Sequence, residues 1–451
     1  MTDVGTTRVP GRAERAAFVG GGVGSFLIAG VAGFVLLYLT DEVGLGAAAV
    51  GTMLLVARIL DGALDPLLGY AVDHLRATRW GRFRPTALVG TALSAVGLVA
   101  LFTLPSVSPW PLATAWLVYL LWGAALGLMT IPLVSLLPVI TDDLRVRSHL
   151  AGLVGLTGLL SSAAVAALTL PLVDLLGGGR RGWGWYAVVV AVFGLCLVLA
   201  LTALVRERVS PSDRGQYTLR EVRTVFFSDW AVPCLLTCKI VVQSASGALT
   251  AVLPFFFLHY MGDKDLLSAA AVVMVVPMGL GAVLIPRRAH RDGIKPWYLA
   301  SLGFSIAGLG SLLLVPADPA PVLLCFALTG LGFGGAAALN LVLLADLTDE
   351  VERRHGYRAE ASLAAIMSFA TKAGAGLGAG AVAYVLALTG YREGRSVQTA
   401  SAIHGVLLAQ SLIPAVLGLL GAAVFLTYPL TRSADRASRP LGSAYPATEE
   451  S

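Results

Sequence analysis

Long apolar runs, separated by short polar segments, follow one another along the whole chain. Each run has about 20 residues, which is the length that a helix needs to cross a bilayer. The runs begin near Phe18, Ala47, Pro85, Ala113, Leu150, Tyr186, Trp230, Leu266, Trp297, Pro321, Ala361 and Gly405. The pattern therefore predicts an all-α membrane protein with twelve transmembrane helices.

The composition agrees with this prediction. Of the 451 residues, 57% are hydrophobic and only 13% are charged, and the mean hydropathy is +0.80. Such a chain is neither a soluble domain nor a disordered one, because both need more polar and charged residues. The first apolar run is long enough to span a membrane and begins only after Arg15, so we expect no cleavable signal peptide.

The basic residues are distributed unevenly between the two sides of the predicted helices. If both ends of the chain are cytosolic, the segments on the opposite side hold few of the 32 lysines and arginines, namely Arg180, Arg181, Lys264, Arg392 and Arg395. Cytosolic segments of membrane proteins carry the excess of lysine and arginine. We therefore predict a multi-pass protein of the cell (cytoplasmic) membrane with a cytosolic N-terminus and a cytosolic C-terminus.

A long polar segment in the middle of the chain divides the apolar runs into six and six. We predict an N-terminal six-helix bundle (residues 1–205), a cytosolic linker (206–229), a C-terminal six-helix bundle (230–430) and a disordered cytosolic tail (431–451). Two such bundles with a cavity between them resemble the major facilitator fold, in which solutes bind near the middle of the membrane.

Two acidic residues, Asp61 and Asp65, lie one helical turn apart inside the second apolar run. They share one face of the helix with Arg58 and lie roughly 18 Å and 12 Å from the end near Asp73, at midplane depth. Charges at this depth are costly and usually functional. The pair needs a shared proton, a bound cation such as sodium, or basic partners, of which Arg58 is near and Lys372, in the eleventh run, is distant.

These charges also suggest how a cation would act. Arg58, Asp61, Asp65 and Lys372 sum to zero without a bound cation, so a loaded cation would displace the lysine and change the packing between the two bundles. Secondary transporters keep their coupling-ion sites at this depth. The alternative interpretation is an ion pair that only fastens neighbouring helices.

The segment from Ala57 to Gly90, which contains both aspartates, strongly resembles the glycoside-pentoside-hexuronide cation symporters, which are the melibiose-permease-like branch of the major facilitator superfamily. Further similar segments are Thr40–Leu45, Leu121–Gly123, Ile131-Pro132, Ser135-Leu136 with Pro138, and Asp346–Asp349. The resemblance implies alternating access, a coupling cation at Asp61 and Asp65, and a charge-balancing role for Lys372. We also predict gate or hinge residues on the cytosolic face, namely Asp73, Gly81, Arg82, Arg84, Asp346, Arg358 and Glu360.

The chain departs from the melibiose type at several positions that would bind sugar and cation. Ser25 stands where that type has an acid in helix one, and Thr130 where it has an acid in helix four. Leu64 replaces an amide and Gly127 a hydroxyl at the cation site. Sodium needs several oxygen ligands, whereas a proton needs one carboxyl group. We therefore favour a proton over sodium and retain Thr130 as a further oxygen of the cation site.

Lys239 lies about 14 Å into the seventh apolar run, with Gln243 one turn further on. It is interpreted either as a lysine that reaches the interface or caps carbonyl groups, or as a contact for an anionic group. The predicted solute contacts are Ser25, Thr130, Lys239, Gln243 and Asn340. The resemblance implies a sugar, glycoside or uronide as substrate. An apolar cavity with one cation also suits an amphiphile, and the vertebrate lysophospholipid symporters, which resemble this family, define that alternative.

Other functional classes have less support. A membrane enzyme would need a nucleophile with its base, or metal ligands, beside the aspartates, and a passive channel would not need two carboxyl groups. We expect the histidines, His259 among them, at surface positions, and Gly177–Gly179 to form a turn. The prediction is a monomeric symporter that is not an enzyme. It takes a small-molecule substrate, binds no nucleic acid, and needs no cofactor or metal beyond a coupling proton or sodium ion.

Overall fold

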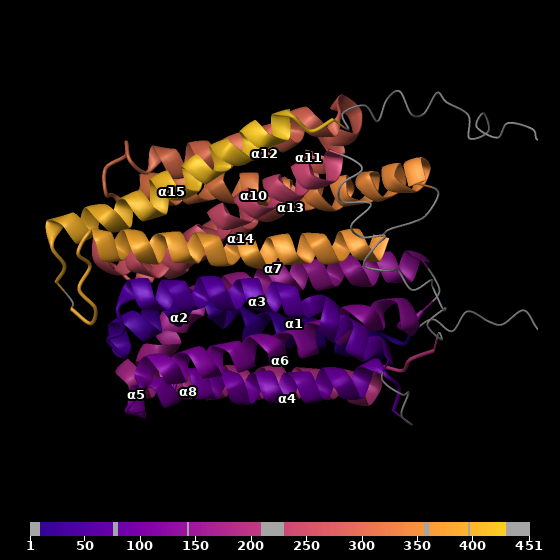
Figure 1. Cartoon of the computed structure of the whole chain (residues 1–451), viewed down its shortest axis with the longest axis horizontal. Helices are drawn as coiled ribbons and strands as arrows, with labels where there is room; N and C mark the ends of the chain where they lie inside the picture. The colour runs from indigo at the N-terminus through magenta and orange to yellow at the C-terminus, as the bar shows by residue number, and fades with distance from the viewer. Residues whose placement is uncertain are drawn as a thin grey trace, which may run out of the picture.

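The computed structural model describes residues 10–74, 80–141, 144–208, 230–355, 360–395 and 397–429, and its regular elements there are helices (Figure 1). The first set comprises α1 (Arg12–Gly30), η1 (Val31–Phe34), α2 (Val35–Leu37), η2 (Tyr38–Glu42), α3 (Ala47–His74), α4 (Phe83–Leu101), α5 (Leu104–Val107), α6 (Pro111–Ile140), α7 (Leu144–Leu175) and α8 (Gly179–Leu204). The second set comprises α10 (Ala231–Phe255), η3 (Phe256–Tyr260), α11 (Asp265–Asp292), α12 (Ile294–Ser311), α13 (Pro319–His355), α14 (Glu360–Leu388) and α15 (Ala400–Leu426).

Within these described ranges, 11 helices are long and apolar enough to cross a membrane. They include α1 to η2, which run on as one span from Arg12 to Glu42. Helix α12 corresponds to the ninth predicted span but has only 18 residues and begins with Ile294-Lys295-Pro296. Helices suit the bilayer because they satisfy their own backbone hydrogen bonds. The predicted all-α membrane fold is confirmed.

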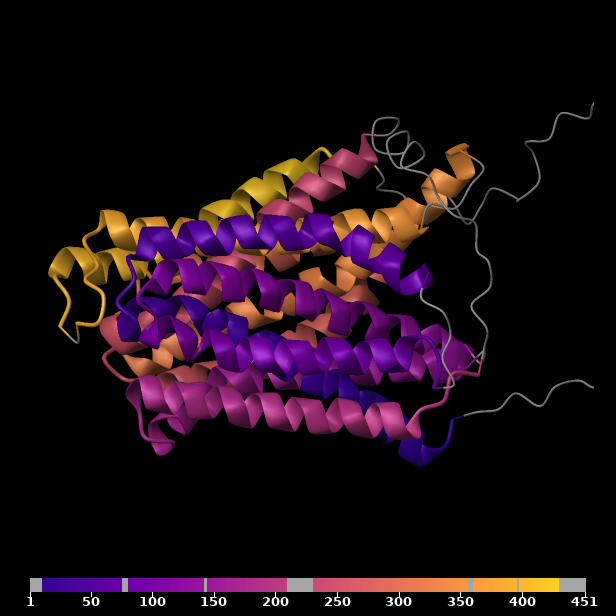
Figure 2. The ribbon, with the colours of Figure 1, turned by 60° about the horizontal axis from the view of Figure 1, so that its bottom comes forward.

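The long helices run nearly parallel and form two groups, one from each half of the chain (Figures 1 and 2). The main contacts between the groups join α3 to α14 and α7 to α11. Glycines allow α3 and α14 to approach closely: a Cβ at Gly51 would lie 2.3 Å from the Cβ of Ala383, and a Cβ at Gly376 would lie 2.7 Å from that of Arg58. The boundaries predicted for the two bundles stay a prediction, and residues 209–229 and 430–451 lie outside the described residues.

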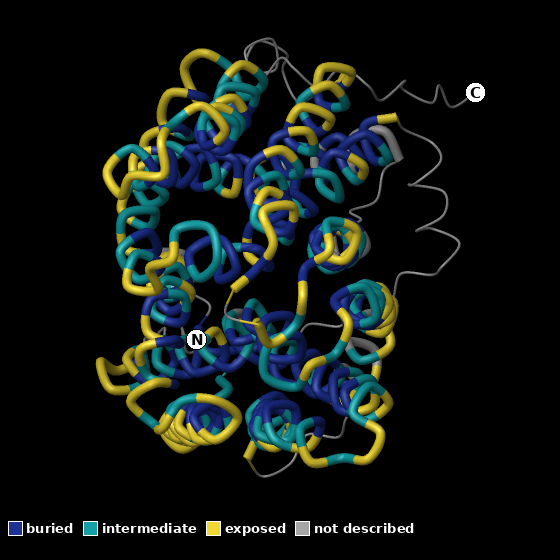
Figure 3. The backbone as a smooth tube through the Cα atoms, turned by 90° about the vertical axis from the view of Figure 1, so that its left-hand side faces the viewer, coloured by how far each residue is buried: buried dark blue, intermediate teal, exposed yellow. Residues whose placement is uncertain are grey.

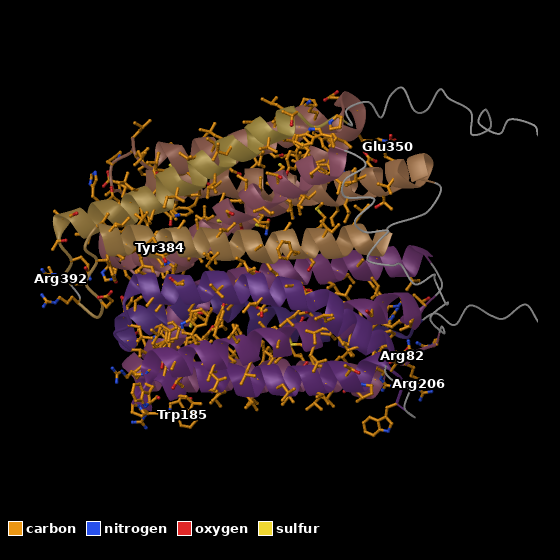
Figure 4. All side chains as sticks on the ribbon, in the orientation of Figure 1. Arg82, Trp185, Arg206, Glu350, Tyr384 and Arg392 are labelled. Atoms are coloured by element: carbon orange, nitrogen blue, oxygen red, sulfur yellow. The ribbon has the colours of Figure 1, made fainter. Side chains whose placement is uncertain are left out.

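The helix array has two ends, which the charges in the sequence predict to be cytosolic and external. We call them the linker end, where α8 ends and α10 begins, and the loop end, where α14 ends and α15 begins. Arg82, Arg206 and Glu350 lie at the linker end, whereas Tyr384, Arg392 and Trp185 lie toward the loop end (Figure 4). Viewed from the loop end, much of the backbone on the outer side of the helix array belongs to exposed residues, as expected for a surface that meets lipid (Figure 3).

Candidate functional site

The centre of the site is an ion pair between the two groups of helices. The Nζ atom of Lys372, on α14, lies 2.6 Å from Oδ1 of Asp65, on α3. The hydroxyl of Ser368, one turn before Lys372, donates to Oδ2 of Asp65 at 3.2 Å. The side chains of the pair are 24% and 14% exposed, so the attraction is only partly screened by water. The two described partners of the Asp65 carboxylate therefore both belong to the opposite half of the chain.

Asp61 lies in the same helix but has a different environment. The residue is 4% exposed, and its buried Oδ1 atom has no hydrogen-bond partner among the described residues. Helix α6 packs against it at Gly123, where a Cβ would lie 2.3 Å from Oδ1. An ionised carboxyl group without a partner is costly in such a place. Asp61 is therefore the carboxyl group of the pair whose charge these described surroundings leave without a direct partner.

Arg58 does not form an ion pair with Asp61 among the described contacts. Its guanidinium group lies over the ring of Tyr119, on α6, with Cζ 5.9 Å from the ring centroid. The arginine thus contributes charge near Asp61 without occupying its oxygens. The alternative interpretation of these residues as an ion pair that only fastens helices fits Asp65 with Lys372, but it leaves Asp61 unexplained.

A cavity of about 710 Å³ lies beside the ion pair of Asp65 and Lys372. Residues of α1, α7, α10, α11, α13 and α14 line it, so both halves of the chain contribute. Most of the lining is apolar, and Lys239, Gln243 and Asn340, which the sequence predicts as solute contacts, are among its polar residues. Ser368 also lines the cavity. It therefore touches both the cavity and the carboxyl group of Asp65.

The other two predicted solute contacts, Ser25 and Thr130, are not among the described residues that line this cavity. The hydroxyl of Ser25 donates to the carbonyl of Gly22 at 2.8 Å, and that of Thr130 to the carbonyl of Leu126 at 2.9 Å. Hydroxyl groups in apolar helices commonly bond to the carbonyl three or four residues earlier. The structure does not bring these two residues together with the other three, and their roles stay predictions.

The predicted gate residues near the start of α4 are organised by Glu207, which sequence reasoning missed. Its carboxylate accepts from the backbone N–H groups of Arg82, Phe83 and Arg84 at 2.9, 2.9 and 3.1 Å, as an acid at a helix N-terminus does. Gly81 has φ +98°, and a Cβ there would collide with the same carboxylate. The guanidinium of Arg84 also donates to the carbonyl of Thr202. These bonds lie within the first set of helices and do not join the two sets.

The remaining gate residues are placed less fully. Asp346 lies in α13. Asp73 and Glu360 lie in α3 and at the start of α14, but their side chains are outside the described part, as is the whole of Arg358. The gate role of all these residues stays a prediction.

At the loop end, three polar residues from both halves form a partly buried cluster. The hydroxyl of Tyr391 donates to Oδ1 and Oδ2 of Asp41 at 2.8 and 2.9 Å, and Nε2 of His259 lies 2.8 Å from that hydroxyl. Burial and the charge of Asp41 raise the pKa of Tyr391, so the tyrosine keeps its proton and its hydroxyl donates a hydrogen bond to Asp41. Nε2 of His259 therefore acts as the donor.

The surface position predicted for His259 is thus wrong. Its side chain is only 9% exposed and lies 3.3 Å from Asp41. The reason is that segments far apart in the sequence meet at this end of the array. The turn predicted at Gly177–Gly179 is confirmed, since all three glycines have positive φ.

Comparisons with known proteins identify the family of the chain. Residues 20–432 match the family described as MFS/sugar transport protein. The chain is 28% identical to the isoprimeverose transporter of Lactiplantibacillus pentosus, over 89% of this chain and 85% of that transporter. It is 29% identical to the glucuronide carrier protein homolog of Escherichia coli (strain K12), over 88% of each. The crystal structure of the nucleoside transporter NupG superposes with a TM-score of 0.67 at 14% identity, over 92% of this chain and 99% of that one, and supports the fold.

These matches cover nearly the whole chain, and they are to transporters. They confirm the predicted resemblance to the glycoside/cation symporters of the major facilitator superfamily, one of which is a putative symporter 27% identical to this chain. They also confirm that the chain is not an enzyme. The chain is a multi-pass membrane transporter and belongs to the MFS/sugar transport protein family.

Proposed function

We propose that this transporter is a proton-coupled symporter of a small organic solute in the cell membrane, with both termini in the cytosol. The observation that carries the proposal is the pair of unlike carboxyl groups on α3. Asp65 is held by Lys372 and Ser368 of the opposite half, and Asp61 is buried with an unpaired oxygen. A change at Asp65 therefore alters a bond with the other half of the chain, and Asp61 can take up a positive ion.

A proton suits Asp61 better than sodium does. Sodium prefers several oxygen ligands at once, and Asp61 has none bonded to it among the described residues. The nearest wall of α6 is Gly123, which has no side-chain oxygen, and the same holds for Gly127 one turn on. A proton needs only the carboxyl oxygen itself.

The proposed cycle starts from the pair between Asp65 and Lys372. Without a bound cation, Arg58, Asp61, Asp65 and Lys372 balance in charge. Once the carboxyl groups take up a cation, the attraction between Asp65 and Lys372 weakens, and the contact of α3 with α14 loses a bond that joins the two halves. Ser368 contacts both Asp65 and the cavity, so a bound solute would influence the same bond.

The relatives suggest the class of solute. Two of them are named for isoprimeverose and for a glucuronide, so we favour a sugar, glycoside or uronide. The largely apolar lining of the cavity favours an amphiphile as the second candidate.

The test is accumulation of radiolabelled glycosides and uronides in proteoliposomes under an imposed gradient of protons or of sodium. We expect a proton gradient to drive uptake and a sodium gradient at constant pH to drive little. Asp61→Asn and Asp65→Asn should each abolish accumulation above the outside concentration. Accumulation that persists in both variants would overturn the proposed coupling, and accumulation that only sodium drives would overturn the choice of ion.

A further inference from the structure

The cavity described above is lined by one positively charged residue, Lys239, in the part of the chain that the structure describes. Among the described residues that line it, Lys239 alone is ionisable at neutral pH, and the others are apolar, glycine, hydroxyl or amide residues. The described lining contains no carboxyl group. Lys239 lies on α10, about 12 Å from the first residue of that helix, Ala231. Its charge therefore faces an uncharged chamber well inside the membrane-spanning part of the chain.

Lys239 also differs from the other lysines of the chain, of which there are three. Lys372 pairs with Asp65, Lys264 with Asp174, and Lys295 donates to the carbonyl of Leu426 at 2.7 Å. Lys239 makes no hydrogen bond or ion pair with any residue that the structure describes. A lysine that capped a helix or fastened two helices would show such a bond. An unpaired ammonium in a largely apolar cavity is costly, and a negative group would relieve that cost.

Gln243 provides a second group for the same ligand. It lies four residues after Lys239, hence on the same face of α10, and it lines the cavity. Its side-chain amide has no hydrogen-bond partner among the described residues either. An ammonium and an amide one turn apart offer N–H donors that suit the oxygens of a carboxylate, sulfonate or phosphate group. The apolar wall, which includes Phe26 and Phe333, would face the rest of the ligand.

We propose that Lys239 binds an anionic group of the solute, with Gln243 beside it, and that this transporter selects organic anions over their neutral analogues. The proposal rests on the proposed function as a solute transporter and names its class of substrate. A monoanion cancels the charge of Lys239, while the coupling cation is balanced separately at Asp61 and Asp65. The anionic group can belong to a sugar acid or to an amphiphile, since both present the same oxygens to the lysine.

The experiment measures binding by calorimetry to the purified full chain in nanodiscs, without any gradient. The probes are two matched pairs: methyl β-D-glucuronide with methyl β-D-glucoside, and decanoate with 1-decanol. The variants are Lys239→Gln, which removes the charge, and Lys239→Arg, which keeps it. Arg287→Gln removes one exposed positive charge from α11, outside the cavity, and is the control. The melting temperature of each variant shows whether it is folded.

We expect at least one anion to bind about tenfold or more tightly than its neutral partner, as removal of a charge-assisted hydrogen bond implies. Lys239→Gln should abolish this preference, whereas Lys239→Arg and Arg287→Gln should keep it. The pair that shows the preference identifies the sugar acid or the amphiphile. Binding of neither anion, equal binding of anion and neutral partner, or an unchanged preference in folded Lys239→Gln would overturn the proposal.

This result is independent of the proposed coupling. Binding without a gradient does not require transport, so a preference that depends on Lys239 stands even if proton-driven accumulation fails. Conversely, proton-driven uptake of a neutral glycoside would support the coupling and contradict the anion selectivity.

Discussion

Gly123 on α6 provides a way to displace the carboxyl group of Asp61 without removing it. A Cβ added at this glycine would lie 2.3 Å from Oδ1, 2.5 Å from Oδ2 and 2.7 Å from Cγ of Asp61. Contacts below 3.0 Å are not tolerated, so in Gly123→Ala the carboxyl group moves, or α6 withdraws from α3. The substitution leaves every charge of the site in place. Its effect therefore reports the position of the Asp61 carboxyl group relative to α6, and no change of charge contributes to it.

The size of the effect follows from the distances. An ordinary contact begins at about 3.4 Å, so the carboxyl group must retreat by about 1 Å. A side chain turned about 30° from its rotamer costs roughly 0.5–1.5 kcal/mol, which corresponds to about two- to tenfold in ion affinity. Overpacking also lowers the free energy of unfolding by about 1–3 kcal/mol. We expect a folded, less stable transporter that needs up to about tenfold more protons for half-maximal uptake.

The matched control is Gly127→Ala, one turn along the same helix. A Cβ there would meet the movable end of Leu68 at 2.8 Å, but Oδ1 of Asp65 only at 3.4 Å. The assay is initial uptake into proteoliposomes as a function of external pH, with the melting temperature measured in parallel. The control should keep the pH dependence of the native protein. If Gly123→Ala also keeps it while remaining folded, Asp61 is not where the coupling ion binds.

Two further predictions concern bonds between the halves of the chain. Ser368→Ala removes the 3.2 Å hydrogen bond to Asp65. We expect coupling to weaken by about 1 kcal/mol, which lowers solute accumulation roughly fivefold, and Ser368→Thr should restore it. An unchanged accumulation ratio in Ser368→Ala would contradict this prediction. Tyr391→Phe removes the partly buried hydrogen bonds to Asp41. Their loss should cost about 1–2 kcal/mol, so the state open at the loop end should gain about five- to thirtyfold in population. Distances between spin labels at the loop ends of α3 and α14 measure this state. Tyr384→Phe, which loses only an exposed bond, should leave the distances unchanged, and equal effects of the two variants would refute the role of the cluster.

The membrane-spanning elements could be predicted from the sequence because the bilayer constrains each segment by its own length and hydrophobicity. A run of about 20 apolar residues that crosses the bilayer forms a helix, because its backbone N–H and C=O groups must form hydrogen bonds with one another, whatever the helix packs against. The shared face of Arg58, Asp61 and Asp65 follows from helical periodicity in the same way. A charge at midplane depth needs a counter-charge, which predicts Lys372 as a partner of these residues, and the structure brings it to Asp65.

The tertiary structure alone decided which group each polar side chain meets. Lys372 lies 307 positions from Asp65 in the sequence, and nothing local separates the paired Asp65 from the unpaired Asp61. Glu207, Ser368 and His259 owe their roles to the packing of helices distant in sequence, and that packing depends on glycines that allow side chains to approach. The sequence by itself determined the helices and the charges inside them. The assembly of those helices determined that Asp65 meets Lys372 and that Oδ1 of Asp61 has no partner among the described residues, because side chains form such bonds only at close range in three dimensions.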